Sequence, residues 1–110
     1  MAIGLRIIPE TLRSIDSSTF TGSLQKLGTP LNYACCLIKF VNNSTVPVTI
    51  SWDGVNNHDI IPAMSFALYD FGSDAGSTRG LYASQNTQFW VSGSAGAGLV
   101  YLTAFHTSEF

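Results

Sequence analysis

The densest group of side chains that could do chemistry consists of Asp53, Asn56, Asn57, His58 and Asp59. Their oxygen atoms are the ligands that calcium prefers, but the segment lacks the alternate ligand spacing and the closing glutamate of an EF-hand loop. Asp and Asn are also favoured in turns, because their side chains bond to nearby backbone groups. We therefore interpret this segment as the solvated tip of a hairpin and predict no metal there.

The other candidates for catalysis also lack a complete motif. His58 and His106 are the two histidines, and no Cys or His pair has the spacing of a zinc site. Asp70 and Asp74 would act as paired carboxylates only if folding brought them to one cleft. The glycine-rich run 93–98 lacks the lysine and the following helix of a phosphate-binding loop, and is expected to be a hairpin connection. We predict no catalytic residue, no cofactor and no enzymatic activity.

The composition favours a chain that other polypeptides cover. At 110 residues it suits a single domain, and its hydrophobic fraction is 45%. Only 11% of the residues are charged, against about 25% in an average soluble domain. Ser, Thr, Asn and Gln make up much of the rest, and such neutral groups cost less to bury at a contact than ions.

Nucleic acid and membrane are not expected partners. The net charge is -2, and the five Lys and Arg residues are scattered along the chain, so no basic patch is indicated. The longest apolar runs, 34–41 and 97–105, fall far short of the roughly 20 residues of a membrane span.

Neither the N-terminus nor the cysteines indicate export. The first residues lack the charged opening, apolar stretch and cleavage site of a secretion signal. Cys35 and Cys36 are adjacent on an expected strand, so their side chains point to opposite faces and are poor disulfide partners. Synthesis in a reducing cytoplasm is the resulting expectation.

The positions of apolar residues predict an all-β domain of six to eight short strands. An antiparallel β-sandwich is favoured, with a jelly roll as one topology and a barrel as the alternative. Residues 34–41 and 46–52 alternate, and the second run is expected to turn Val48 and Ile50 inward. Residues 42–46 have the composition of a turn. The run 72–80 is expected to be a mobile loop.

Two further strands are expected, at residues 65–71 and 99–105. Residues 65–71 set Phe66 and Leu68 against Ala67 and Tyr69, and we expect Phe66 inside and Tyr69 exposed or covered by another subunit. Residues 99–105 are expected to form a central strand covered from both sides.

Residues 1–30 are too sparse in apolar side chains for a core of their own. We expect them to form either an edge hairpin or an extended N-terminal arm laid on a neighbour, with residues 31–110 forming the β-sandwich domain. Ile3, Leu5 and Ile7 alternate with other residues, and Phe20 stands among hydroxyl side chains.

The aromatic residues suggest two kinds of binding surface. Trp52, Tyr69, Trp90 and Tyr101 could form a platform for sugar rings. Aromatic residues are also enriched at protein interfaces, and the low charge favours that interpretation. The candidate interface residues are Ile3, Leu5, Ile7, Phe20, Tyr69 and Trp90.

Two stretches of the sequence resemble a family of small virion proteins of tailed bacteriophages, especially short-tailed ones. They read FVNNSTVPVTISWDGVNNHDIIPAMSFALYDF and ASQNTQFWVSGSAGAGLVYLTAF. The shared pattern is an NN turn, a V-T-x-S-W/F-D-G hairpin, an I/V-P-A-x-S-F-x-L-Y-D segment, a G-T/Q-x-F/V-x-V strand, and a glycine-containing turn before a final apolar strand. It spans residues 33–105, and Asn86 and Thr87 depart from it by replacing the more usual glycine of a turn.

The resemblance implies a non-enzymatic virion structural protein made in the host bacterial cytoplasm. It would be an oligomeric neck or tail accessory module that binds copies of itself and attaches other virion parts. A capsid decoration or cement protein and a carbohydrate-binding module are the alternatives.

Overall fold

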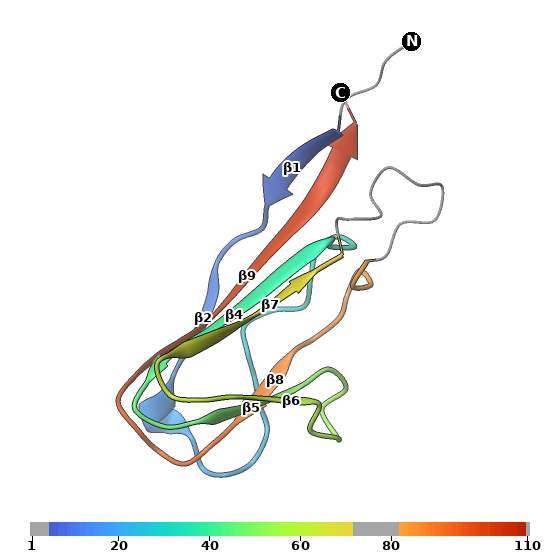
Figure 1. The fold of residues 1–110 in the computed structure, drawn as a ribbon. Coiled ribbons are helices and arrows are strands. Elements are labelled where there is room, and N and C mark those ends of the chain that lie inside the picture. The colour runs from blue at the N-terminus through green and yellow to red at the C-terminus, as the bar shows by residue number, and fades with distance from the viewer. Residues whose placement is uncertain (1–4, 72–81, 110) are drawn as a thin grey trace.

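The computed structural model describes residues 5–71 and 82–109. These residues form nine strands and one short 3-10 helix, arranged as two antiparallel sheets (Figure 1). The predicted all-β, sandwich-like class is thereby confirmed. The loop expected at 72–80, which includes Asp74, lies outside the described residues, as does Ile3.

The first sheet, sheet A, is built around one long strand. In spatial order it runs β1-β9-β4-β7, and β2 pairs with the other end of β9 on the same side as β1. Its strands are β1 (Leu5–Pro9), β2 (Arg13–Asp16), β4 (Leu37–Ser44), β7 (Ser65–Asp70) and β9 (Gly98–Glu109). The expected central position of residues 99–105 is confirmed, because β9 has partners along both edges.

The second sheet, sheet B, runs in the order β3-β8-β5-β6. Its strands are β3 (Gln25–Lys26), β5 (Val48–Ser51), β6 (Asp59–Ile61) and β8 (Trp90–Ser92), and the 3-10 helix η1 (Ser17–Thr19) precedes it. The glycine-rich run 93–98 leads from β8 in sheet B to β9 in sheet A. The hairpin predicted there is wrong, since the two strands that it joins do not pair.

The strand pairings are nested along the chain. β2 pairs with β9, β3 with β8, β4 with β7, and β5 with β6. Between β2 and β9, every connection except β5–β6 passes from one sheet to the other. The chain therefore follows the course of one long antiparallel hairpin that is rolled over to form two layers.

The core lies between the sheets and combines mainly aliphatic side chains with a group of aromatic rings. Phe40 and Phe89 are almost wholly buried and meet edge to face, with ring centroids 5.2 Å apart. Trp52 lies edge-on against Phe89, at 4.7 Å between centroids. The inward orientation predicted for Val48 and Ile50 is confirmed.

Strand β7 has the opposite phase to the one predicted. Phe66 and Leu68 are 63% and 51% exposed, whereas Ala67 and Tyr69 pack against the core. Directly opposed residues of an antiparallel pair share a face, and Ala67 lies opposite the buried Phe40. Because β7 is apolar on both faces, its sequence alone does not decide which face turns inward.

The turn predicted at residues 42–46 begins later than expected. Asn42 and Ser44 belong to β4 and are fully buried. The Asn42 side-chain amide donates to the carbonyls of Val46, Ile61 and Pro62, and its oxygen accepts from the backbone N–H of Ser44. These bonds tie sheet A to the end of β6.

Candidate protein interface

The candidate interface residues of the N-terminal segment lie in different surroundings. Leu5 is paired with Glu109 in the backbone register of β1 with β9, and Ile7 on the same strand is 66% exposed. Phe20 is 4% exposed and packs in the core together with Leu27. Of these residues, Ile7 therefore presents a large apolar side chain to solvent.

Tyr69 is half-buried and engaged with its own chain. Its ring lies edge-on to Phe40 and Trp52, at 5.9 and 5.8 Å between centroids. Its hydroxyl donates a hydrogen bond to Asp59. Burial raises the pKa of Tyr69, and the hydrogen bond to Asp59 and the charge of that carboxylate raise it further. The phenol stays protonated and joins β7 to β6.

Trp90 is also half-buried, on the outer side of sheet B. The ammonium nitrogen of Lys26 lies 5.8 Å from its ring centroid. Gly54, at φ +79°, approaches the ring so closely that a Cβ there would lie 2.7 Å from the Trp90 Cε2 atom. The indole thus covers the loop after β5.

The four aromatics considered as a sugar platform do not share one face. Trp52 and Tyr69 pack against each other and the core, while Trp90 belongs to the outer side of sheet B. Tyr101 lies opposite Val41 on sheet A, on the side that faces away from sheet B. The structure therefore separates these rings.

The strongest candidate site is the side of sheet A that faces away from sheet B, here called the outer face. Its large exposed residues come from three strands: Ile7 (66%), Phe66 (63%), Leu68 (51%) and Leu99 (36%). Half-buried apolar residues fill the area between them: Leu37, Val41, Tyr101 and Phe105. Residues 99–105 are thus covered by sheet B on one side only, and not from both sides as predicted.

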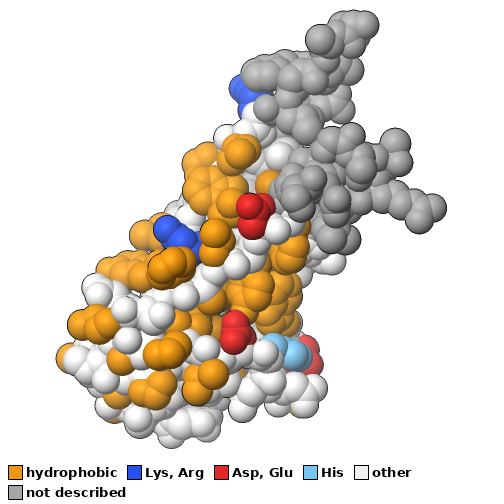
Figure 2. All heavy atoms as spheres, in the orientation of Figure 1, with side chains coloured by type: hydrophobic (Ala, Val, Ile, Leu, Met, Phe, Trp, Pro, Cys, Tyr) orange, Lys and Arg blue, Asp and Glu red, His pale blue; other side chains and the backbone are white. Residues whose placement is uncertain are grey.

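The register of the strands places these side chains side by side. Phe66 lies opposite Val41, which lies opposite Tyr101. Leu37 lies opposite Phe105 in the same way. Opposed side chains have Cβ atoms about 5 Å apart, so each row forms an apolar strip. Between the two strips lies a row in which Leu68 is followed by Lys39 and Thr103. Figure 2 shows how few charged side chains stand among the hydrophobic ones on the visible side of the molecule.

Lys39 lies in the middle of the outer face, opposite Leu68 and Thr103. Two carboxylates lie nearer its margins, Asp70 opposite Leu37 and Asp16 opposite Leu99. With strands about 4.8 Å apart and a rise of about 3.3 Å per residue, four strands and the eight residues of β4 span roughly 500 Å² of sheet plane. The apolar part of this area, about a few hundred Å², is in the range of the largest apolar patches on typical monomers, which are often functional. The surface can therefore serve as a protein contact.

Sequence reasoning missed Phe66, Leu68 and Leu99 as interface candidates. The available signal was the apolar character of both faces in 65–71 and 99–105. A two-layer sandwich covers only one face of each sheet, so the second apolar face of these strands remains available for a partner.

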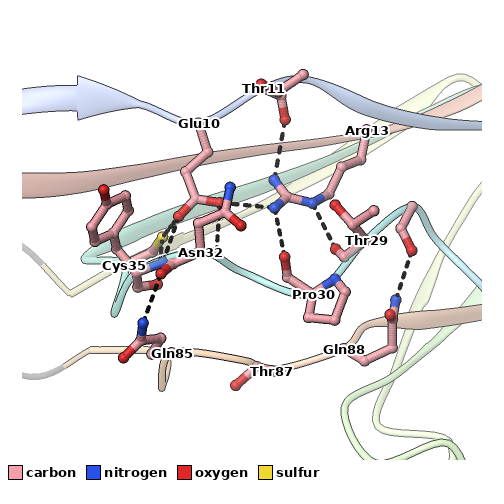
Figure 3. Close-up of polar contacts among 12 residues, drawn as sticks. Glu10, Thr11, Arg13, Thr29, Pro30, Asn32, Cys35, Gln85, Thr87 and Gln88 are labelled. Carbon is pink, nitrogen blue, oxygen red and sulfur yellow. Dashed lines mark hydrogen bonds and ion pairs between the residues drawn. The ribbon is translucent and has the colours of Figure 1, made fainter.

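A second notable site is a buried ionic cluster between β1 and β2 (Figure 3). The Arg13 and Glu10 side chains are 4% and 1% exposed, and Arg13 Nη2 lies 2.8 Å from Glu10 Oε1. The guanidinium also donates to the carbonyl oxygens of Thr11, Thr29 and Pro30. These bonds hold the β1–β2 corner against the loop that follows β3.

The Glu10 carboxylate also accepts several hydrogen bonds. Burial by itself would raise its pKa, but hydrogen bonds from the Asn32 and Tyr33 N–H groups and from Arg13 outweigh that effect and lower it. Burial and the neighbouring Glu10 charge raise the pKa of Cys35 to about 12. The Cys35 thiol therefore stays protonated, and the Arg13 side chain is buried. We interpret this cluster as structural.

The described residues show no further site for chemistry. None of their His, Cys, Asp and Glu side chains form a group of three or more that could hold a metal, and residues 5–71 and 82–109 enclose no pocket. Asp53 accepts hydrogen bonds from the Val55 and Asn56 N–H groups, which lower its pKa, as in a solvated turn. No helix in the described part of the chain is long and apolar enough to cross a membrane.

Comparison with family models, with curated proteins and with solved structures finds no match to this chain.

Proposed function

We propose that this chain is a non-enzymatic structural protein of the virion of a tailed bacteriophage. In this proposal it is a homo-oligomeric neck or tail accessory module that attaches other virion parts. The observation that carries the proposal is the outer face of sheet A, where Phe66 and Leu68 are 63% and 51% exposed on a chain with only 11% charged residues. Burying these side chains against a neighbour is favourable, at roughly 25 cal/mol per Å² of apolar surface.

The connectivity supports an assignment as a jelly roll. Eight strands, β2 to β9, pair in the nested order that a rolled antiparallel hairpin requires, with four in each sheet. Jelly rolls are common in viral capsid proteins and in lectins. A fold does not by itself determine a function, so this argument supports the proposal only together with the outer face.

The segments that resemble phage virion proteins contribute most of that face. Residues 40–71 include β5, β6 and β7 together with most of β4, and residues 83–105 include β8 and most of β9. The N-terminal segment takes part through β1, whose Ile7 lies on the outer face opposite Thr107. The proposed partners are further copies of this chain and other virion proteins, met first in the bacterial cytoplasm and then in the particle.

Self-association is tested by measuring the mass of the purified chain in solution. The wild type is expected to form a defined oligomer, and Phe66→Lys to shift it toward the monomer. Ile60→Lys is the matched control, because Ile60 is also 63% exposed but lies on sheet B. A monomeric wild type at all concentrations contradicts the proposal.

The place in the virion is tested by imaging particles made without this gene. Stable heads that lack tails or fibres are expected for a neck or tail module. Heads that burst would instead indicate a capsid decoration or cement protein. Normal, infectious particles would contradict both.

A further inference from the structure

We propose that a second copy of this chain binds along the free edge of β7, so that the β7 strands of the two copies pair antiparallel about a two-fold axis. This proposal rests on the proposed function, and it specifies which part of the outer face contacts the second copy. The result is one continuous sheet that runs through both copies from β4 to β7 and on to the partner's β7 and β4.

The four sheet edges differ in how well they are protected. Among the described residues, β3 has two residues and β6 has three, followed directly by Pro62. The β1–β2 edge is interrupted by residues 10–12 and contains Pro9. Short strands, proline and interruptions are the usual protections against edge pairing. Strand β7 has six residues, SFALYD, with neither proline nor lysine.

The backbone of β7 has hydrogen-bonding groups on its free edge. The N–H of Phe71, just after the strand, donates to the Cys36 carbonyl next to β4. Backbone groups alternate in direction along a strand, so those of Tyr69 and Ala67 point to β4 and those of Phe66 and Leu68 point away. In the described part of the chain, β4 is the strand that pairs with β7.

An antiparallel pairing centred on Ala67 makes the edge self-complementary. Phe66 then lies opposite Leu68 of the second copy, and Leu68 lies opposite the partner's Phe66. Both members of such a pair point to the same face, and each pair exchanges two N–H···O bonds. The two most exposed apolar side chains of β4 and β7 are thereby packed against each other, as an isologous contact requires.

Lys39 favours this arrangement over stacking two outer faces. It lies in the middle of the outer face, opposite Leu68 and Thr103. Face-to-face stacking would remove from water both its ammonium group and the Asp70 carboxylate on the same face, and taking ions out of water is costly. Edge pairing leaves the ammonium group in water and keeps the remaining outer face available to other virion proteins.

Amide hydrogen exchange tests the proposal residue by residue. The rates are measured above and below the concentration at which the wild type assembles. The amides of Phe66 and Leu68 are expected to exchange about tenfold more slowly in the assembled state, while that of Ile60, which bonds to the Asp59 side chain, is unchanged. An assembled protein whose Phe66 and Leu68 rates do not change overturns β7 pairing and leaves the proposed function standing. A chain that never assembles overturns both.

A pair of substitutions at one position provides an independent test. Leu68→Ala and Leu68→Pro both remove the leucine side chain, but only proline removes the outward amide, which the β4–β7 ladder does not use. Because each copy would lose one donor, Leu68→Pro is expected to weaken association about tenfold more than Leu68→Ala. Circular dichroism verifies that both variants fold. Equal weakening by the two folded variants overturns the proposal.

Discussion

Removing the Glu10 carboxylate is the most informative test of what holds the N-terminal segment in place. Arg13 is 5% exposed, so the Glu10→Ala variant would leave a buried guanidinium without its anion. Breaking a buried ion pair from one side costs about 3–5 kcal/mol. Three backbone carbonyls still accept from the guanidinium, and the Asn32 and Tyr33 amides lie at an exposed position where water can replace the carboxylate.

We therefore expect a loss near the lower end of that range, about 3 kcal/mol in the free energy of unfolding. The free energy of unfolding of a domain of this size is roughly 5–15 kcal/mol, so we expect the variant still to fold. Urea unfolding followed by the fluorescence of Trp52 and Trp90 measures the difference. A loss below about 1 kcal/mol, the value typical of an exposed pair, would refute the reasoning.

The same cluster predicts a pH dependence with a definite sign. The folded-state pKa of Glu10 lies below its ordinary value of 4.5. The contribution of the Glu10 carboxylate to the free energy of unfolding is therefore complete above pH 4.5, and it is lost as the pH falls through the folded-state pKa. The stability difference between wild type and Glu10→Gln should be largest near neutral pH and shrink in acid. A difference that grew on acidification would contradict this assignment.

Three further variants and measurements test the core, a strand end and a thiol. Phe40→Ala should cost about 3–5 kcal/mol in urea unfolding, because it empties the site between the sheets where Phe89 packs. Gly98→Ala should cost about 1–3 kcal/mol by the same assay, since Gly98 has φ +108° and a Cβ there would overlap the Asn43 carbonyl oxygen. Cys35, with a pKa of about 12, should react with iodoacetamide at pH 8 far more slowly in the native than in the urea-unfolded chain; equal rates would contradict its burial.

Local pattern was sufficient for the class of fold and for several strands. The alternation in residues 46–52 correctly predicted that Val48 and Ile50 face inward, because only one face of that run is mainly apolar. The Asp and Asn residues of 53–57 correctly indicated a turn, since Asp53 satisfies nearby amides by itself.

Only the tertiary structure decided which strands pair and which apolar face is left uncovered. The phase of β7 depends on the register that sets Ala67 against Phe40, and this pairing is between residues far apart in the chain. The ion pair of Glu10 and Arg13 has no local signal of burial, because the loop that covers it comes from residues 28–35. Side-chain alternation depends on neighbours in sequence, whereas burial depends on neighbours in space. In this nested sandwich the alternation therefore predicts the buried face correctly only for strands with one polar face.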